Sequence, residues 1–150
     1  MTSRTPRASR HRSREAALQV LYALDLAHPD GADLARAGAE AFESASEHFE
    51  LPEGARAFAK ELIAGVTAHR SALDDVLSAH ARNWRLARMA TVDRNVLRLA
   101  VFELLHTATP APVVIDVAVE LARRFSGEKS PAFVNGILDA VAHAVRPEVA

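Results

Sequence analysis

Arginine side chains dominate the first fourteen residues of the chain. Five of them stand there without an acidic residue to pair with: Arg4, Arg7, Arg10, Arg12 and Arg14. A guanidinium is permanently charged, and its planar fork of donors matches the oxygens of a phosphate. An arginine-rich segment can therefore hold RNA and become ordered as it binds. The same run also fits a solvated terminus that binds nothing, and the residues alone leave both interpretations open.

Two aromatic residues stand where a nucleobase could stack. Tyr22, the only tyrosine, lies on the helix predicted directly after the arginines and offers a ring with a hydroxyl group. Near the other end of the chain, Lys129, Ser130 and Phe133 stand at a predicted helix start, where free N–H groups favour an anion. Both rings also fit the edge of a hydrophobic core, since Phe133 continues a stripe with Ile137. Stacking on a base and packing in the core stay open for both.

Patterns typical of catalysis or metal binding are weak. The stretch GEKS at residues 127–130 looks like the end of a phosphate-binding loop, but it lacks the preceding strand and the earlier glycine. There is no cysteine, and no two of the seven histidines are three or four residues apart, as two ligands on one helix face would be. We therefore expect no metal, no cofactor and no enzymatic activity.

The charge of the chain is unevenly distributed. The net charge is −1, so the part that follows the five arginines is acidic overall and suits a basic protein partner. Charged residues recur in every window up to Glu15, which excludes a secretory signal, and no apolar run approaches the roughly 20 residues that cross a membrane. Together with the lack of cysteine, these features predict a cytoplasmic protein without a membrane segment.

Apolar residues recur at helical spacing along almost the whole chain. We predict an all-α fold of about seven helices, which begin near Ser13, residue 33, Pro52, Ser71, residue 91, residue 113 and Ser130. Ser13 and Ser130 are expected to cap their helices. Ser71 followed by Asp74 is an acidic variant of the capping box. Gly136, inside the last helix, predicts a close helix crossing.

The predicted helices form one domain behind an arm. Residues 1–12 are expected to be a flexible, arginine-rich arm, and residues 13–150 a single helical domain. The basic segment 82–89 shows little periodicity, so we place a joint there, between subdomains of about residues 13–81 and 82–150. Helices with such short connections pack as bundles.

Four stretches together resemble a known family. In chain order they are RHRSREAALQVLYALDL (10–26), ELIAGVTAHRSALD (61–74), VDRNVLRLAVFELL (92–105) and VVIDVAVELARRFSGEKSPAFVNGILDAV (113–141). They resemble the NusB family of transcription antitermination and termination factors. The likeness spans nearly the whole chain, and residues 27–60 are the least characteristic. It implies a NusB-like fold of two three-helix bundles packed together, and a role without catalysis.

The resemblance also implies partners and site residues. Its members bind the boxA element of ribosomal-RNA leader transcripts, usually with NusE, a ribosomal protein of the small subunit, and join the RNA polymerase antitermination complex. By position, the resemblance places six residues on the RNA-binding surface: Arg10, Arg12, Arg14, Tyr22, Lys129 and Phe133. The arginine run and the helix start add Arg7 and Ser130 to our RNA-binding candidates. The resemblance assigns Asp93 to the contact with NusE, and at a helix start its carboxylate is expected on the surface.

Other functions stay open at this level. The chain fits a protein–protein adaptor whose arginines are incidental, and a related helical domain is an accessory to some ribosomal-RNA methyltransferases. Because the chain ends at residue 150 without room for a catalytic domain, we expect the free-standing factor. Some family members are homodimers, so monomer and homodimer are both open, as is the preferred RNA sequence.

Overall fold

Helices make up almost all of the described chain. The computed structural model describes residues 6–28, 31, 33–81 and 83–147, and this part contains no strand. Its elements are α1 (Pro6–Ala27), α2 (Leu34–Phe49), α3 (Glu53–His80), the 3-10 turn η1 (Leu86–Arg88), α4 (Thr91–His106), α5 (Ala111–Phe125) and α6 (Ser130–Val145). The predicted all-α fold is confirmed, with six α-helices in place of about seven.

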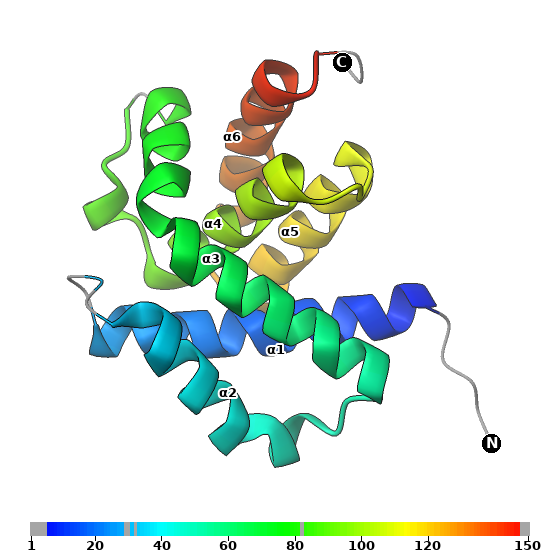
Figure 1. Ribbon diagram of the computed structural model, residues 1–150. Coiled ribbons are helices and arrows are strands. Elements are labelled where there is room, and N and C mark those ends of the chain that lie inside the picture. The colour runs from blue at the N-terminus through cyan, green and yellow to red at the C-terminus, as the bar shows by residue number, and fades with distance from the viewer. Residues whose placement is uncertain (1–5, 29–30, 32, 82, 148–150) are drawn as a thin grey trace. The chain divides into compact units, whose positions relative to one another are not determined.

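The helices group into two compact units, Met1–Ala68 and His69–Ala150. The first unit holds α1, α2 and the first part of α3, and the second holds the rest of α3 with α4, α5 and α6 (Figure 1). The division therefore falls inside α3 and not at the joint predicted near residue 82. The last turns of α3 belong with α4 because Asp74 forms a two-bond ion pair with Arg98, at 2.7 and 2.9 Å.

The predicted helix start at Ser71 is wrong, because α3 continues through it. The buried stripe of α3 keeps one register across this point, from Ile63 and Val66 to Leu73 and Leu77. A continuous apolar stripe stabilises one long helix more than a serine favours a new start. Asp74 is accordingly an ion-pair partner and not a cap.

The helix α1 begins at Pro6, seven residues before the predicted start at Ser13, so the flexible arm predicted for residues 1–12 is helical from Pro6 onward. Proline is favoured at a first helical position, and this signal precedes the arginines. Ser13 is buried inside the helix and does not cap it. Its hydroxyl donates to the carbonyl oxygen of Ala55 in α3 at 2.7 Å, and the carbonyl oxygen of Ser9 lies at 3.0 Å from the same hydroxyl. Residues 1–5 of the predicted arm lie outside the described residues.

Close packing in the first unit occurs at Gly38 of α2. A Cβ added at this glycine would meet side-chain carbons of Ile63 at 3.0 Å and Leu24 at 3.3 Å, so any larger residue would require these side chains to shift by a few tenths of an ångström. Gly136 of α6, where a close crossing was predicted, is exposed, and a Cβ there would meet nothing within 4 Å. The prediction for Gly136 is therefore wrong.

In the second unit, α4, α5 and α6 pack side by side (Figure 1). As predicted from its apolar residues on most sides, α4 is the central helix, and every residue from Asn95 to Leu104 is buried. Arg146, just after α6, closes the end of α4: its guanidinium donates to the carbonyl oxygens of Glu103, Leu104, Thr107 and Thr109. A helix end leaves such carbonyls without partners, so one side chain satisfies several of them. None of the described helices is long and apolar enough to cross a membrane.

Candidate nucleic-acid interface

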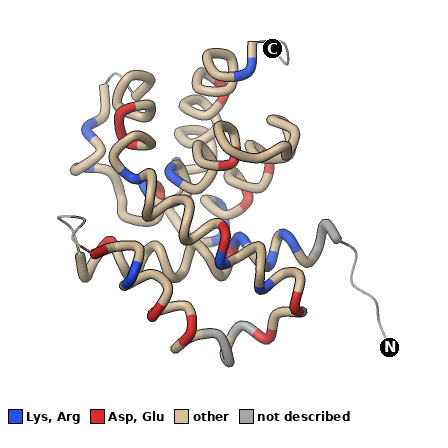
Figure 2. The backbone as a smooth tube through the Cα atoms, viewed as in Figure 1, with Lys and Arg blue, Asp and Glu red and all other residues tan. Residues whose placement is uncertain are grey.

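The first turns of α1 carry the arginines, and Figure 2 shows this basic stretch. Phe58 of α3 lies beneath two of them: the guanidinium carbon of Arg10 is 4.1 Å from its ring centroid, and that of Arg14 is 5.4 Å away. Arg12 donates to the carbonyl oxygen of Glu50 at 3.0 Å. Such contacts place these guanidinium groups against the surface of the first unit.

The arginines differ in what they leave exposed. Arg10 is exposed and Arg12 is half-buried, so both can reach a phosphate from the surface of the unit. Arg14 is only 4% exposed, and its expected place on the binding surface is wrong. Its proximity to Phe58 makes it part of the packing between α1 and α3. The side chain of Arg7 lies outside the described residues.

Tyr22, further along α1, is 38% exposed and does not belong to the buried core of the first unit. The exposed ring fits the stacking interpretation better than the core interpretation, because a core tyrosine would be covered by its neighbours. Its role in RNA binding stays a prediction.

A hollow of about 200 Å³ lies in the second unit, at the start of α6. Its lining includes all the candidates from this half of the chain: Asp93, Lys129, Ser130 and Phe133. The segment before α4 adds four residues to the lining: Trp84, Arg88, Met89 and Ala90. The side chains of Arg88 and Lys129 are exposed at this hollow. Positive charge, aromatic rings and a helix N-terminus therefore occur in one place, as a site for a nucleotide needs.

Asp93 is buried in the wall of this hollow, with 7% exposure, so its expected place on the surface is wrong. The hydroxyl of Ser130 donates to its Oδ2 at 3.0 Å. Ser130 is thus the first residue of α6, and its side chain binds Asp93 of α4. It does not cap its own helix as predicted. The second oxygen of Asp93, Oδ1, is buried and accepts no hydrogen bond. The contact with NusE assigned to Asp93 stays a prediction.

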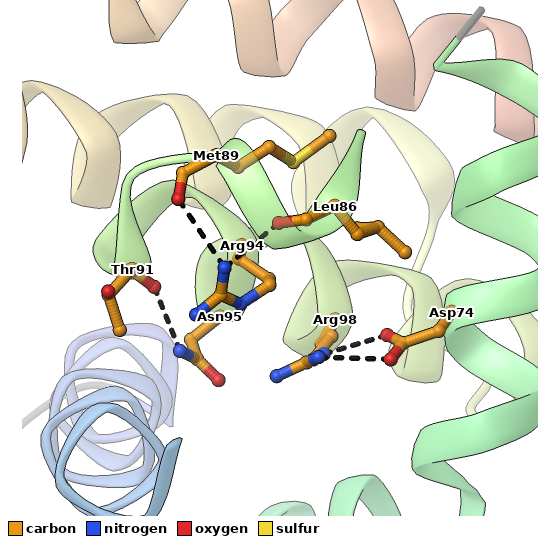
Figure 3. Close-up of polar contacts among 7 residues, drawn as sticks. All are labelled: Asp74, Leu86, Met89, Thr91, Arg94, Asn95 and Arg98. Carbon is orange, nitrogen blue, oxygen red and sulfur yellow. Dashed lines mark hydrogen bonds and ion pairs between the residues drawn. The ribbon is translucent and has the colours of Figure 1, made fainter. Parts of the chain in front are cut away.

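The segment that forms the other wall is fixed by α4. Arg94 donates to the carbonyl oxygens of Leu86 at 2.9 Å and Met89 at 3.4 Å, as Figure 3 shows. About one turn of α4 further on, Arg98 binds Asp74 in the same view. Because backbone carbonyls are anchored to α4, the 3-10 turn η1 holds a defined position, and the side chains of Trp84 and Arg88 are presented from a fixed support.

Phe133 lies in the hollow, half-buried, and its ring forms an edge-to-face pair with that of Trp84. The two centroids are 5.2 Å apart, and the planes make an angle of 76°. Trp84 itself is 58% exposed. Sequence reasoning did not select Trp84 or Arg88, although an aromatic residue between basic ones in RNWRLAR (82–88) is a signal typical of nucleic-acid binding. The sequence could not show that this segment meets α6.

The candidates thus form two sets, one in each unit. The first unit carries Arg10, Arg12 and Tyr22 on α1, and the second carries Lys129, Ser130 and Phe133 around the hollow. Within the described parts of the chain, no group of three histidine, aspartate or glutamate side chains is placed to hold a metal ion. These features define the class: a small all-helical protein whose surfaces suit the binding of a polyanion that has bases to stack.

Comparison with known proteins gives the family. The family model described as the NusB family matches residues 11–143. A transcription antitermination protein NusB of Anaeromyxobacter dehalogenans strain 2CP-1 is 48% identical over 148 residues, which are 98% of this chain and 96% of the relative. The protein of the same description from Myxococcus xanthus is 46% identical over 138 residues, which are 91% and 96% of the two chains.

Solved structures agree with this result. NusB of T. maritima has a TM-score of 0.77 and 36% identity, covering 93% of this chain and 92% of that one. A structure of the antitermination factors NusB and NusE in complex with double-stranded RNA contains a chain with a TM-score of 0.75 and 31% identity, covering 91% of this chain and 98% of that one. The chain belongs to the NusB family.

Proposed function

We propose that the chain is a transcription antitermination factor that binds boxA-type single-stranded RNA of ribosomal-RNA leaders together with NusE. It would then act in the cytoplasm, within the RNA polymerase antitermination complex. The observation that carries this proposal is the hollow at the start of α6, where the aromatic ring of Phe133 and the exposed cation of Lys129 meet. An aromatic face and a positive charge are the two elements that bind a single strand.

The two sets of residues divide the work of binding. Arg10 and Arg12 on α1 attract phosphates, and this attraction does not depend on the base sequence of the RNA. Tyr22 and Phe133 supply ring faces, which bind unpaired bases and so favour a single strand over a duplex. The acidic charge of the remaining chain attracts a basic ribosomal protein such as NusE.

The comparisons support this function over the alternatives. The relatives reported above are named transcription antitermination proteins, and the chain covers 96% of the length of each. The similar chain solved with NusE and RNA supports partners of both kinds. Neither finding favours an adaptor without RNA, or an accessory domain of a methyltransferase.

A titration tests the proposal. Fluorescence anisotropy of an end-labelled boxA RNA should show saturable binding that becomes tighter when NusE is present. A scrambled RNA of the same length and composition is the control, and it should bind more weakly under the same salt. Equal affinity for both RNAs, with and without NusE, would contradict the proposed function.

A further inference from the structure

We infer that the hollow at the start of α6 receives one nucleobase that carries an amino group, with Trp84 as a stacking ring and Arg88 as a phosphate contact. The inference rests on the RNA binding proposed above and names the part of the RNA that this site selects. Neither Trp84 nor Arg88 was among the candidates from the sequence. Both line the hollow beside Phe133 and Lys129.

The size and walls of the hollow limit its occupant. At about 200 Å³ it is smaller than the roughly 300–1,000 Å³ of pockets for complete small molecules, so it suits one ring system at a time. Trp84 and Phe133 meet edge-to-face, so Phe133 covers at most one face of the exposed Trp84 ring and leaves the other face uncovered. A planar base on that face gains stacking of the kind that binds single strands.

The wall of the hollow contains an acceptor atom that lacks a hydrogen-bond donor. Asp93 Oδ1 is a buried acceptor without a partner, while Oδ2 is occupied by the hydroxyl of Ser130. An amino group of cytosine, adenine or guanine can donate to it, and cytosine is known to pair with carboxylates in this way. Uracil has no amino group, and two carbonyl oxygens flank its single N–H. Because Oδ1 is buried, a lining side chain must move as the base enters, and exposed side chains rotate within nanoseconds.

The rim of the hollow distinguishes RNA from a protein partner. A lysine or arginine of a protein could also donate to Asp93, but it would have to pass the exposed cations Arg88 and Lys129. A nucleotide has the opposite distribution of charge, with a neutral base to insert and a phosphate to leave outside. The acceptor inside and the cations outside therefore favour a nucleotide.

Trp84 allows a direct test, because it is the only tryptophan in the chain. A base stacked on an indole quenches its fluorescence. Titration of the wild-type protein with unlabelled boxA RNA should quench the emission, with the same midpoint as the anisotropy titration. An unchanged emission at saturating RNA would overturn the inference while leaving the proposed function intact.

Substitutions give the second test. Trp84→Ala should weaken RNA binding about 5- to 150-fold, whereas Trp84→Phe should retain most of the affinity. Leu105→Ala is the matched control, because Leu105 is an exposed apolar residue of the same unit that does not line the hollow. For the phosphate contact, Arg88→Gln should weaken binding and Arg36→Gln, an exposed arginine of α2, should not. Equal affinity of Trp84→Ala and wild type, both folded by circular dichroism, would refute the role of Trp84.

Base replacement tests the selection of an amino group. Each cytosine of the RNA is changed singly to uracil, each adenine to purine riboside and each guanine to inosine; the last two changes remove only the amino group. At one position the change should weaken binding to the wild type at least about 10-fold, and this difference should shrink in Asp93→Asn. Asparagine keeps the acceptor for Ser130 but alters the hydrogen bonding of the second atom. If no single position behaves in this way, the selection of an amino group is wrong.

The protein alternative has its own outcome. Should Asp93→Asn and Trp84→Ala weaken binding of NusE in the absence of RNA, and leave RNA affinity and base preference unchanged, the hollow would be a protein contact and the inference would fall. Failure of the wild type to bind any RNA would instead contradict the proposed function itself.

Discussion

The hydroxyl of Ser130 donates to the Oδ2 atom of Asp93 at 3.0 Å, and this bond joins the first residue of α6 to the first turn of α4. Both groups are buried. Lys129 precedes Ser130 directly, and Phe133 follows within one turn, so the bond fixes the point from which both project into the hollow. The carboxylate of Asp93, which was expected to contact a partner, thus positions residues of the site itself.

Ser130→Ala should lower the free energy of unfolding by about 1–3 kcal/mol, because it leaves a second buried oxygen of Asp93 without a donor. Urea denaturation followed by circular dichroism measures this change. Ser126→Ala is the control, since the Ser126 hydroxyl contacts Ser130 at 2.9 Å but does not bind the carboxylate. A stability equal to that of the wild type would show that the bond contributes little.

Asp93→Lys, the charge reversal suggested by a surface carboxylate, is expected to unfold the second unit. The residue is buried, and a lysine there would be an uncompensated buried charge, which costs about 3–5 kcal/mol. Thermal melts of Asp93→Lys and Asp93→Asn check this expectation, with Asp93→Asn close to the wild type. If Asp93→Lys melts like the wild type, the carboxylate is more accessible than its burial indicates.

Phe133→Ala should separate stacking from packing. The ring is half-buried and lies outside the buried core, so we expect a loss of RNA affinity of about 1–3 kcal/mol with a small change in melting temperature. A core phenylalanine would instead cost about 3–5 kcal/mol of stability. One thermal melt and one RNA titration on this variant decide between them. A large fall in melting temperature, with affinity kept in the folded fraction, would exclude stacking.

The salt dependence of RNA binding should report the arginines of α1. Each phosphate contact to a single strand contributes about −0.7 to the slope of log affinity against log salt. Changing Arg10 and Arg12 to glutamine should therefore make the slope less steep by about 1.4. Arg36→Gln, on α2, is the control for the loss of a surface charge. An unchanged slope in the double variant would remove these two arginines from the interface.

Arg146→Ala should destabilise the second unit, because the end of α4 loses a donor to four carbonyl oxygens. Hydrogen bonds from a charged group contribute about 1.5–3 kcal/mol, so we expect a loss of at least that size. Arg146→Lys should recover only part of it, since an ammonium lacks the planar fork of donors. Denaturant unfolding of the two variants gives the comparison, and equal stability of all three proteins would contradict it.

Gly136→Ala should raise the free energy of unfolding by about 1 kcal/mol, since alanine favours a helix interior and its Cβ would meet nothing within 4 Å. Thermal unfolding measures the gain, and RNA and NusE titrations on the same variant show whether this exposed face is used. A destabilised variant would mean that the glycine is needed by the fold itself.

The sequence by itself determined the helical content and most helix ends. Proline residues separate α4 from α5 and end α6, because a proline removes a donor and restricts the residue before it. The apolar stripes of α4 and α6 correctly predicted which faces are buried, since a helix is stabilised by burying one continuous face. Lys129, Ser130 and Phe133 were placed together because they are neighbours within one helical turn.

Only the tertiary structure decided which distant residues meet. Ser13 and Ser71 predicted helix starts, yet both lie inside longer helices. Ser13 is buried there by its hydrogen bond to Ala55, and Ser71 lies on a helix with one continuous buried stripe. The burial of Asp93 depends on its contact with Ser130, which is 37 residues away in the sequence. The position of the Trp84 ring likewise depends on its contact with Phe133. A local sequence pattern indicates the conformation that a segment prefers by itself. Packing between segments decides whether a polar side chain faces water or a partner.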